Sequence, residues 1–212
     1  MTKKCNKCLN EKDLSLFHNK KGGKLGKNHI CKECRKSEGK EKVIYIYSKK
    51  IDLGSKCSLC EFNNLQCLEF HHLGNKLKLI DEFNKKEDID KEIDKCILLC
   101  SFCHHLQVKH PKNRNLRVKR NYDFVDQEKL IIGNCQDCKR NVDLDNLSAF
   151  HFDHLKDKKY NISYMCSNKF SLWNIWQEIK KCQLLCVNCH KIKTNIQFNR
   201  LSYLEQSLKI NY

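Results

Sequence analysis

The 212-residue sequence has few of the residues that build large apolar domains or membrane spans. It contains one Pro, seven Gly, two Met and two Trp, and its 40% of hydrophobic residues includes 16 Cys. Its longest apolar runs, Val43–Tyr47 and Ile97–Cys100, are far shorter than the ~20 residues that cross a bilayer. Such a chain cannot bury a large core, so we expect small modules stabilised by metal ions or disulfides.

The first residues also lack the apolar stretch of a secretory signal. Met1–Cys5 reads Met-Thr-Lys-Lys-Cys, and no hydrophobic segment follows it. We therefore expect an intracellular protein with no membrane partner. Because disulfides are rare in reducing compartments, a cysteine-dense chain there indicates metal ligation.

Acidic residues are scarce relative to basic ones, at 25 Asp+Glu against 41 Lys+Arg, for a net charge of +16. This excess predicts a polyanionic partner, DNA in the first place, with RNA not excluded. The net charge is +9 over residues 1–52, +1 over 53–128 and +6 over 129–212. The basic runs are either solvated or contact phosphates. The candidate DNA contacts in these runs are Lys20, Lys21, Lys24, Lys27, Arg114, Arg117, Lys119 and Arg120.

Cysteine spacing is the strongest pattern in the chain. Twelve of the 16 cysteines fall in six Cys-x-x-Cys pairs. One such turn presents two thiolates on one side of a tight loop, and two turns complete a tetrahedral S4 site that suits Zn²⁺. The spacing predicts three structural zinc sites and disfavours disulfides or redox dithiols. Paired in chain order, the ligands are Cys5, Cys8, Cys31 and Cys34; Cys57, Cys60, Cys100 and Cys103; and Cys135, Cys138, Cys186 and Cys189.

Two segments of the chain repeat each other. Glu92–His104 matches Glu178–His190 at a constant offset of 86, with nine of thirteen positions identical. Upstream, Phe70–Leu73 matches Phe152–Leu155. Two copies of one unit explain these matches better than chance does. The expected domains are a basic zinc ribbon-like module over 1–52, a first unit over 53–108, a basic linker over 109–128, and a second unit with a C-terminal helix over 129–212.

Each repeat is expected to be a small α+β, zinc-stabilised module. Apolar alternation predicts strands over 65–73 and 147–154, each ending at a pair of polar residues. A helix, the second cysteine pair and another helix should follow each strand. Cys96 and Cys182 are expected on apolar helical faces, and 201–208 as a last helix.

These motifs together resemble the HNH endonucleases, the ββα-metal or His-Me finger nucleases, in their zinc-stabilised form. The resemblance covers roughly residues 55–200, and the segment with the first two cysteine pairs resembles a small zinc module that precedes such domains in phage and viral proteins. The matching motifs are Cys57-x-x-Cys60, Glu69-Phe70-His71-His72 and Lys95–His104, and again Cys135-x-x-Cys138, Phe152-Asp153-His154 and Lys181–Thr194.

The resemblance implies a role for each strand-end residue. His72 and His154 would be general bases, and a divalent metal, Mg²⁺ or Mn²⁺, would be held by His71 with His104 and by Asp153 with His190. A carboxylate such as Asp153 suits Mg²⁺, whereas His71 in the same place favours softer ions. One departure is that Lys95 and Lys181 stand where the family has an Asn.

The implied function is a metal-dependent DNA endonuclease with two tandem units, of the homing or recombination type found in viruses and mobile elements. The alternative is a non-catalytic, zinc-dependent nucleic-acid-binding protein whose units are relics. Retention of the base histidine in both copies favours catalysis.

Overall fold

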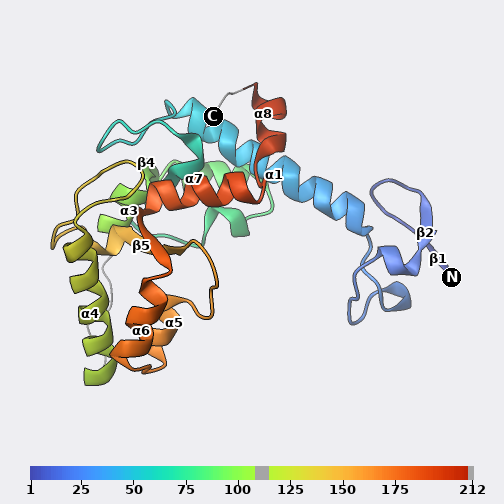
Figure 1. The fold of residues 1–212 in the computed structure, drawn as a ribbon. Coiled ribbons are helices and arrows are strands. Elements are labelled where there is room, and N and C mark those ends of the chain that lie inside the picture. The colour runs from blue at the N-terminus through green and yellow to red at the C-terminus, as the bar shows by residue number, and fades with distance from the viewer. Residues whose placement is uncertain (108–114, 210–212) are drawn as a thin grey trace.

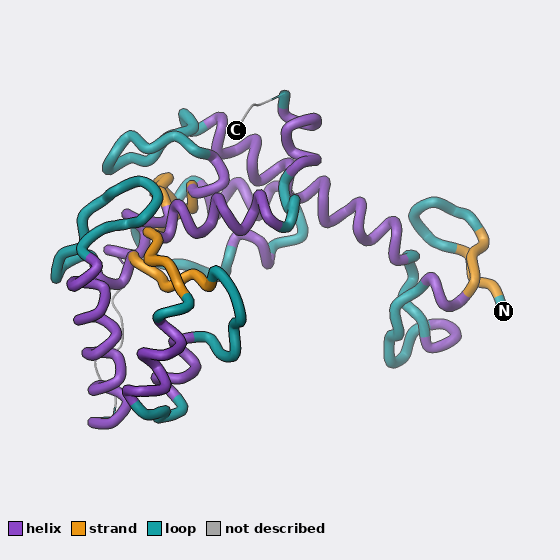
Figure 2. The backbone as a smooth tube through the Cα atoms, in the orientation of Figure 1, coloured by secondary structure: helices purple, strands orange, loops and turns teal. Residues whose placement is uncertain are grey.

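In the computed structural model, which describes residues 1–107 and 115–209, the chain is a small α+β protein with three two-stranded antiparallel sheets (Figures 1 and 2). The strands are β1 Thr2–Lys4, β2 Glu11–Asp13, β3 Leu68–His72, β4 Cys96–Cys100, β5 Phe150–His154 and β6 Cys182–Cys186. The helices are α1 Lys32–Asp52, α2 Lys86–Ile93, α3 Ser101–Gln107, α4 Leu116–Ile132, α5 Ile162–Ser167, α6 Leu172–Ile179, α7 Val187–Gln197 and α8 Ser202–Leu208.

The N-terminal module stands apart from the rest of the chain, at one end of the long helix α1 (Figure 1). Its β1–β2 ribbon is short, and its buried core consists of Phe17, Ile30 and cysteines. Helix α1 begins at Cys31, whose side chain accepts the backbone N–H of Cys34 as an N-cap. The module therefore depends on its cysteine cluster, because its apolar residues are too few to form a core.

The far end of α1 packs into the main body and buries a lysine there. Lys50 is only 6% exposed, its Nζ lies 3.9 Å from the centre of the Tyr47 ring, and it donates a 3.4 Å hydrogen bond to the carbonyl of Leu65. Burial, aided by the charge of Lys191, lowers the pKa of Lys50 from 10.5 to about 7. The folded state thus carries a desolvated ammonium with no buried carboxylate bound to its Nζ among the described residues.

Replacing Lys50 by Met is expected to stabilise the fold, because the side chain keeps its length and loses its charge. We expect a gain of about 1–2 kcal/mol at pH 7, or a rise in Tm of roughly 2–8 °C. Between pH 7 and 10.5 the unfolded parent binds a proton that the folded parent lacks, so the parent gains stability as pH rises. Thermal melts at pH 7 and 9.5 should show the difference between the two proteins shrinking, and a constant difference would contradict this assignment.

Each repeat forms a two-stranded antiparallel sheet, and the two sheets have the same register. We call each strand pair a hairpin, although a helical segment connects its strands. Leu68 pairs with Cys100 and His72 with Cys96 in the first, and Phe150 pairs with Cys186 and His154 with Cys182 in the second. The first unit runs in the order strand, helix, strand, helix, and the second has two helices, α5 and α6, between its strands. The prediction of Cys96 and Cys182 on helical faces was wrong, because each residue begins a strand whose inner residues are buried on both faces. A short apolar run of this kind has no periodicity that separates strand from helix.

The interval predicted as a solvated basic linker is mostly helical. Helix α4 begins after Asn115, whose side chain accepts the N–H of Val118, and ends at Gly133 with a φ of 78°. It contacts α5 and α6, and its Val125 is buried with Met165 and Ile175. The linker prediction was therefore wrong from residue 116 onward, because the cations occupy only the outer face of an amphipathic helix. Residues 109–114 lie outside the described residues.

The two repeats share one hydrophobic core, which buries Leu68, Leu99, Phe150 and Leu185 together with Leu204 of α8. Helix α8 confirms the expected last helix, and it also contacts α1.

Helices α3 and α7 cross at the interface between the repeats. The backbone N–H of Phe102 donates to the side-chain oxygen of Asn188 at 2.9 Å, and the rings of Phe102 and Phe150 meet edge to face at 5.7 Å. Lys191 bonds Glu69 across the same interface at 2.7 Å. The repeats thus form a single body. No helix within residues 1–107 and 115–209 combines the length and apolar character that a bilayer crossing needs.

Candidate metal centres and strand-end histidine sites

The three predicted groups of four cysteines converge into three clusters. In each, the four sulfurs lie within 4.8 Å of one another. The Sγ–Sγ distance is 3.8 Å for Cys5–Cys34, 3.7 Å for Cys60–Cys100 and 3.7 Å for Cys138–Cys186. Sulfurs about 2.3 Å from a tetrahedral Zn²⁺ lie about 3.8 Å apart, whereas disulfide sulfurs lie about 2.0 Å apart. All sixteen cysteines lie within the described residues and none of them forms a disulfide there, so the clusters fit structural zinc.

Backbone N–H groups prepare these sulfurs for a cation. Cys5 accepts the N–H of Cys31 at 3.3 Å, and Cys135 accepts the N–H of Cys186 at 3.2 Å. A hydrogen bond from the Cys189 side chain is the main cause that lowers the pKa of Cys186 to about 5. At Cys5 and Cys186 such bonds favour the thiolate, which is the form that binds zinc.

Asp153 of β5 and His190 of α7 meet on one face of the second hairpin. The Asp153 carboxylate lies 3.5 Å from His190 Nε2, and its other oxygen accepts hydrogen bonds from Lys193 at 2.6 Å and Gln183 at 3.0 Å. Burial raises the pKa of Asp153, but the Lys193 and Gln183 bonds outweigh it, so the pKa is lowered overall. An ionised carboxylate oxygen and an imidazole nitrogen side by side are suitable ligands for a divalent ion.

The same place in the first hairpin holds His71 and His104, whose ring centres are 5.2 Å apart. Nδ1 of His104 lies 2.9 Å from Glu69, which leaves Nε2 for a metal, as in carboxylate–histidine–metal arrangements. The cross-repeat bond from Lys191 also helps to hold Glu69 in place, and despite burial it contributes to the lowered pKa of Glu69. The two places therefore differ in the side chains that they would offer to a metal ion.

Neither centre gathers a third ligand closely. Among the described residues, only the three cysteine clusters bring at least three ligand atoms within 4.8 Å of one another. His151, whose ring centre is 5.7 Å from that of His190, lies on the same strand face as Asp153. Among the described residues, each place would thus offer an ion two nearby side chains, and the other coordination positions would be left for water or substrate oxygens.

The proposed bases lie on the opposite strand face, each bound to a buried glutamate. Nε2 of His72 is 3.0 Å from Glu92, and Nε2 of His154 is 3.0 Å from Glu178. The glutamate side chains are 1% and 4% exposed. A neutral imidazole that donates Nε2–H to this carboxylate keeps the lone pair on Nδ1, so the glutamate selects the tautomer that can accept a proton.

Lys95 and Lys181 complete this arrangement. Lys95 lies 2.8 Å from Glu92, and Lys181 lies 2.7 Å from Glu178. Although burial opposes it, the hydrogen bond from Lys181 helps to lower the pKa of Glu178 to about 2. The same kind of bond from Lys95 is the main cause of the lowered pKa of Glu92. Both carboxylates are thus ionised across the physiological pH range.

Sequence reasoning did not assign a role to either glutamate. The signal was present, because Glu92 and Glu178 are identical positions of the two repeats and stand three residues before the lysines. That repeat identity could not show the contact with a histidine 20 or 24 residues earlier.

Each candidate base and the neighbouring candidate metal ligand are consecutive residues, so their side chains leave the strand on opposite faces. The structure brings His190 to Asp153 and Glu178 to His154, and no described contact joins His154 to His190 or His72 to His104. These contacts therefore place the two histidines of each repeat with different partners. In the second repeat, the His190–Asp153 pair and the Glu178–His154 pair lie on opposite faces of the same strand end.

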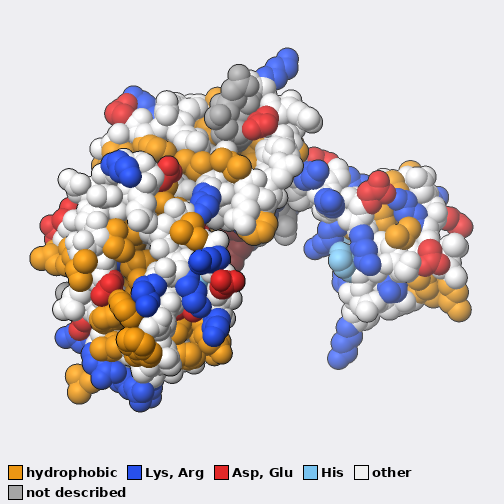
Figure 3. Space-filling model, in the orientation of Figure 1, with side chains coloured by type: hydrophobic (Ala, Val, Ile, Leu, Met, Phe, Trp, Pro, Cys, Tyr) orange, Lys and Arg blue, Asp and Glu red, His pale blue; other side chains and the backbone are white. Residues whose placement is uncertain are grey.

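The candidate DNA contacts lie in two regions. Lys20, Lys24 and Lys27 line a hollow of the N-terminal module together with Lys3 and Lys4, and Lys21 is exposed beside it. Basic side chains are also visible on both parts of the molecule in Figure 3. Arg117, Lys119 and Arg120 are exposed on the first turns of α4, and Arg114 lies outside the described residues.

Comparison of the chain with family models, with curated proteins and with solved structures gives no significant match.

Proposed function

We propose that this protein is a metal-dependent endonuclease that hydrolyses phosphodiester bonds of DNA, with two HNH-like units in tandem. One observation carries the proposal. Both hairpins end in the same way, with a glutamate-bound histidine on one face and a pair of metal-ligand side chains on the other. A purely structural zinc module has no need for this arrangement twice.

The roles follow from the second repeat. Glu178 holds His154 with Nδ1 unprotonated, and Nδ1 takes a proton from the attacking water. Because Asp153 and His154 are consecutive, their Cα atoms are ~3.8 Å apart, and one phosphodiester lying across the strand end is close to both. Glu178 acts through His154, so it is a positioning residue.

Asp153 and His190 would hold the catalytic ion of this repeat, and His71 and His104 that of the first. When bound, a divalent ion supplies charge stabilisation to a phosphate oxygen and the leaving oxygen. Lys193 donates a hydrogen bond to a carboxylate oxygen of Asp153. It would release this Asp153 oxygen as the ion binds, and it stays near enough to contact a phosphate. The basic hollow of the N-terminal module and the start of α4 would contact the DNA backbone outside the cut.

The purified chain is expected to nick supercoiled plasmid when Mg²⁺ or Mn²⁺ is added. Gel electrophoresis of relaxed and linear products measures the rate, and the control reaction contains the zinc-loaded protein without added metal. Mg²⁺ should act mainly through the Asp153 centre, so Asp153→Ala should shift the remaining activity towards Mn²⁺ or Ni²⁺.

DNA binding without nicking under every added metal would contradict catalysis and favour the non-catalytic, zinc-dependent binding protein. Nicking that persists without added divalent metal would contradict the assignment of the two ligand pairs.

A further inference from the structure

A cluster of aromatic rings lies exposed on the second repeat, and neither the core nor the zinc site explains it. Tyr160 and Tyr164 stack with their ring centres 5.9 Å apart and an angle of 16°, and Phe170 lies 5.2 Å from Tyr160. The tyrosines are 45% and 49% exposed. Phe170 packs against the buried cluster beneath, so it fixes the position of the two rings above it. We call these three residues the aromatic patch.

The aromatic patch is attached directly to the candidate base. The backbone N–H of Tyr160 donates to Glu178 at 3.3 Å, and that of Lys159 donates to the same oxygen at 2.7 Å. This oxygen is also the one that His154 contacts. The backbone that carries the first ring is thus held by the carboxylate that positions the proposed base.

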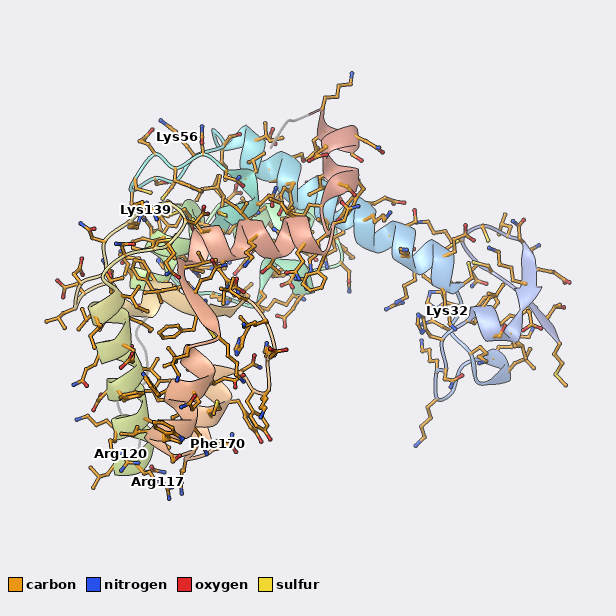
Figure 4. All side chains as sticks on the ribbon, viewed as in Figure 1. Lys32, Lys56, Arg117, Arg120, Lys139 and Phe170 are labelled. Atoms are coloured by element: carbon orange, nitrogen blue, oxygen red, sulfur yellow. The ribbon has the colours of Figure 1, made fainter. Side chains whose placement is uncertain are left out.

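Basic residues lie on the segment that carries the aromatic patch and on the helix that it contacts. Asn121 of α4 donates to the carbonyl of Phe170 at 3.0 Å, which joins the patch to the helix that carries the exposed Arg117 and Arg120. Figure 4 shows Phe170 at the same end of the α4–α6 lobe as these two arginines. The segment 156–181 also contains six lysines, and its two acids are Asp157 and the buried Glu178.

The first repeat has no such surface. Its corresponding segment, residues 73–85, contains Phe83 as its single aromatic residue, and Phe83 is 7% exposed beneath Lys78. The exposed rings are therefore a feature of one unit, and the common fold does not require them.

We propose that the aromatic patch stacks unpaired bases of a nucleic-acid single strand beside the second strand-end site, while the neighbouring lysines and arginines neutralise its phosphates. Exposed rings flanked by cations are the chemistry that binds single strands without sequence preference, because every base has a π-face. Bases in an intact duplex are stacked on each other and do not offer that face. This inference deepens the proposed function, because it names single-stranded or locally opened DNA as the substrate of this site.

Fluorescence anisotropy of a labelled oligothymidine, and of a labelled duplex of equal length, tests the proposal. The measurement uses the full zinc-loaded chain without added divalent metal, so that the DNA is not cut. We expect the Tyr160→Ala/Tyr164→Ala variant to bind the single strand about tenfold or more weakly, and the duplex within about twofold of the parent. Tyr160→Phe/Tyr164→Phe keeps both rings and should bind like the parent.

Phe198→Ala is the matched control, because Phe198 is a ring that is 59% exposed at the end of α7, outside the aromatic patch. Zinc content and far-UV circular dichroism confirm that each variant is folded. Unchanged single-strand affinity in the double alanine variant would overturn the proposal. An equal loss for the duplex, or for Phe198→Ala, would do the same. A selective loss in a protein that never nicks DNA would support the aromatic patch and remove the nuclease proposal, so the two failures are distinguishable.

Discussion

Replacing Cys186 by Ser is expected to unfold the second repeat and to reduce the bound zinc from three ions per chain to two. Cys186 ends β6, pairs with Phe150 of β5 and is 1% exposed, so its cluster connects the hairpin to α7. Structural zinc contributes about 10–16 kcal/mol to folding in small modules. That exceeds the stability of most domains of this size, so losing the site removes the fold. Zinc release measured with a colorimetric chelator, together with thermal melting, checks both effects.

Cys182→Ser is the matched control, because it makes the same substitution at the other end of the same strand. Its thiol donates to the carbonyl of Glu178, and a serine hydroxyl can keep that bond. We expect three zinc ions and a Tm close to that of the parent. Three ions retained by Cys186→Ser, or a mass lower by about 2 Da per cysteine pair in the parent, would show that the clusters are not zinc sites.

The zinc clusters were predictable because their information is local. A Cys-x-x-Cys turn fixes two sulfurs within four residues, and chain order alone then pairs the turns correctly. The strands β4 and β6, which lead into the second cysteine pair of each repeat, could not be predicted in the same way. Cys-Ile-Leu-Leu-Cys of β4 is buried on both faces, and only its pairing with β3, some 30 residues earlier, makes it a strand.

The strand-end sites show the same limit. The paired residues His71-His72 and Asp153-His154 stand out in the sequence. The sequence does not show, however, which side chains each face of the strand contacts. The hydrogen bonds that Glu178 accepts from His154 and that Glu69 accepts from Lys191 join residues far apart in the chain. The second of these also joins two repeats, so it depends on how the units pack and leaves no mark in the spacing within either one.

Removal of both proposed bases, by His72→Ala with His154→Ala, is expected to lower plasmid nicking by about 10²–10⁴-fold while leaving DNA binding unchanged. The lysines proposed to contact phosphates and the twelve clustered cysteines remain in this variant. His18→Ala is the control, since His18 is exposed in the N-terminal module. A double variant that cuts as fast as the parent would show that neither histidine is the base.

The single variants then assign the activity to a repeat. Asp153 gives the second centre the ligand that suits Mg²⁺, so in Mg²⁺ we expect His154→Ala to lose most of the rate and His72→Ala little. The nicking rate of Glu178→Gln should lie between those of His154→Ala and the parent. The amide still contacts Nε2 of His154, but it no longer stabilises the protonated imidazole electrostatically. Its nicking rate should also change its dependence on pH, which a purely structural role for Glu178 would not produce. Equal rates for Glu178→Gln and the parent over the whole pH range would show that the buried carboxylate does not act through His154.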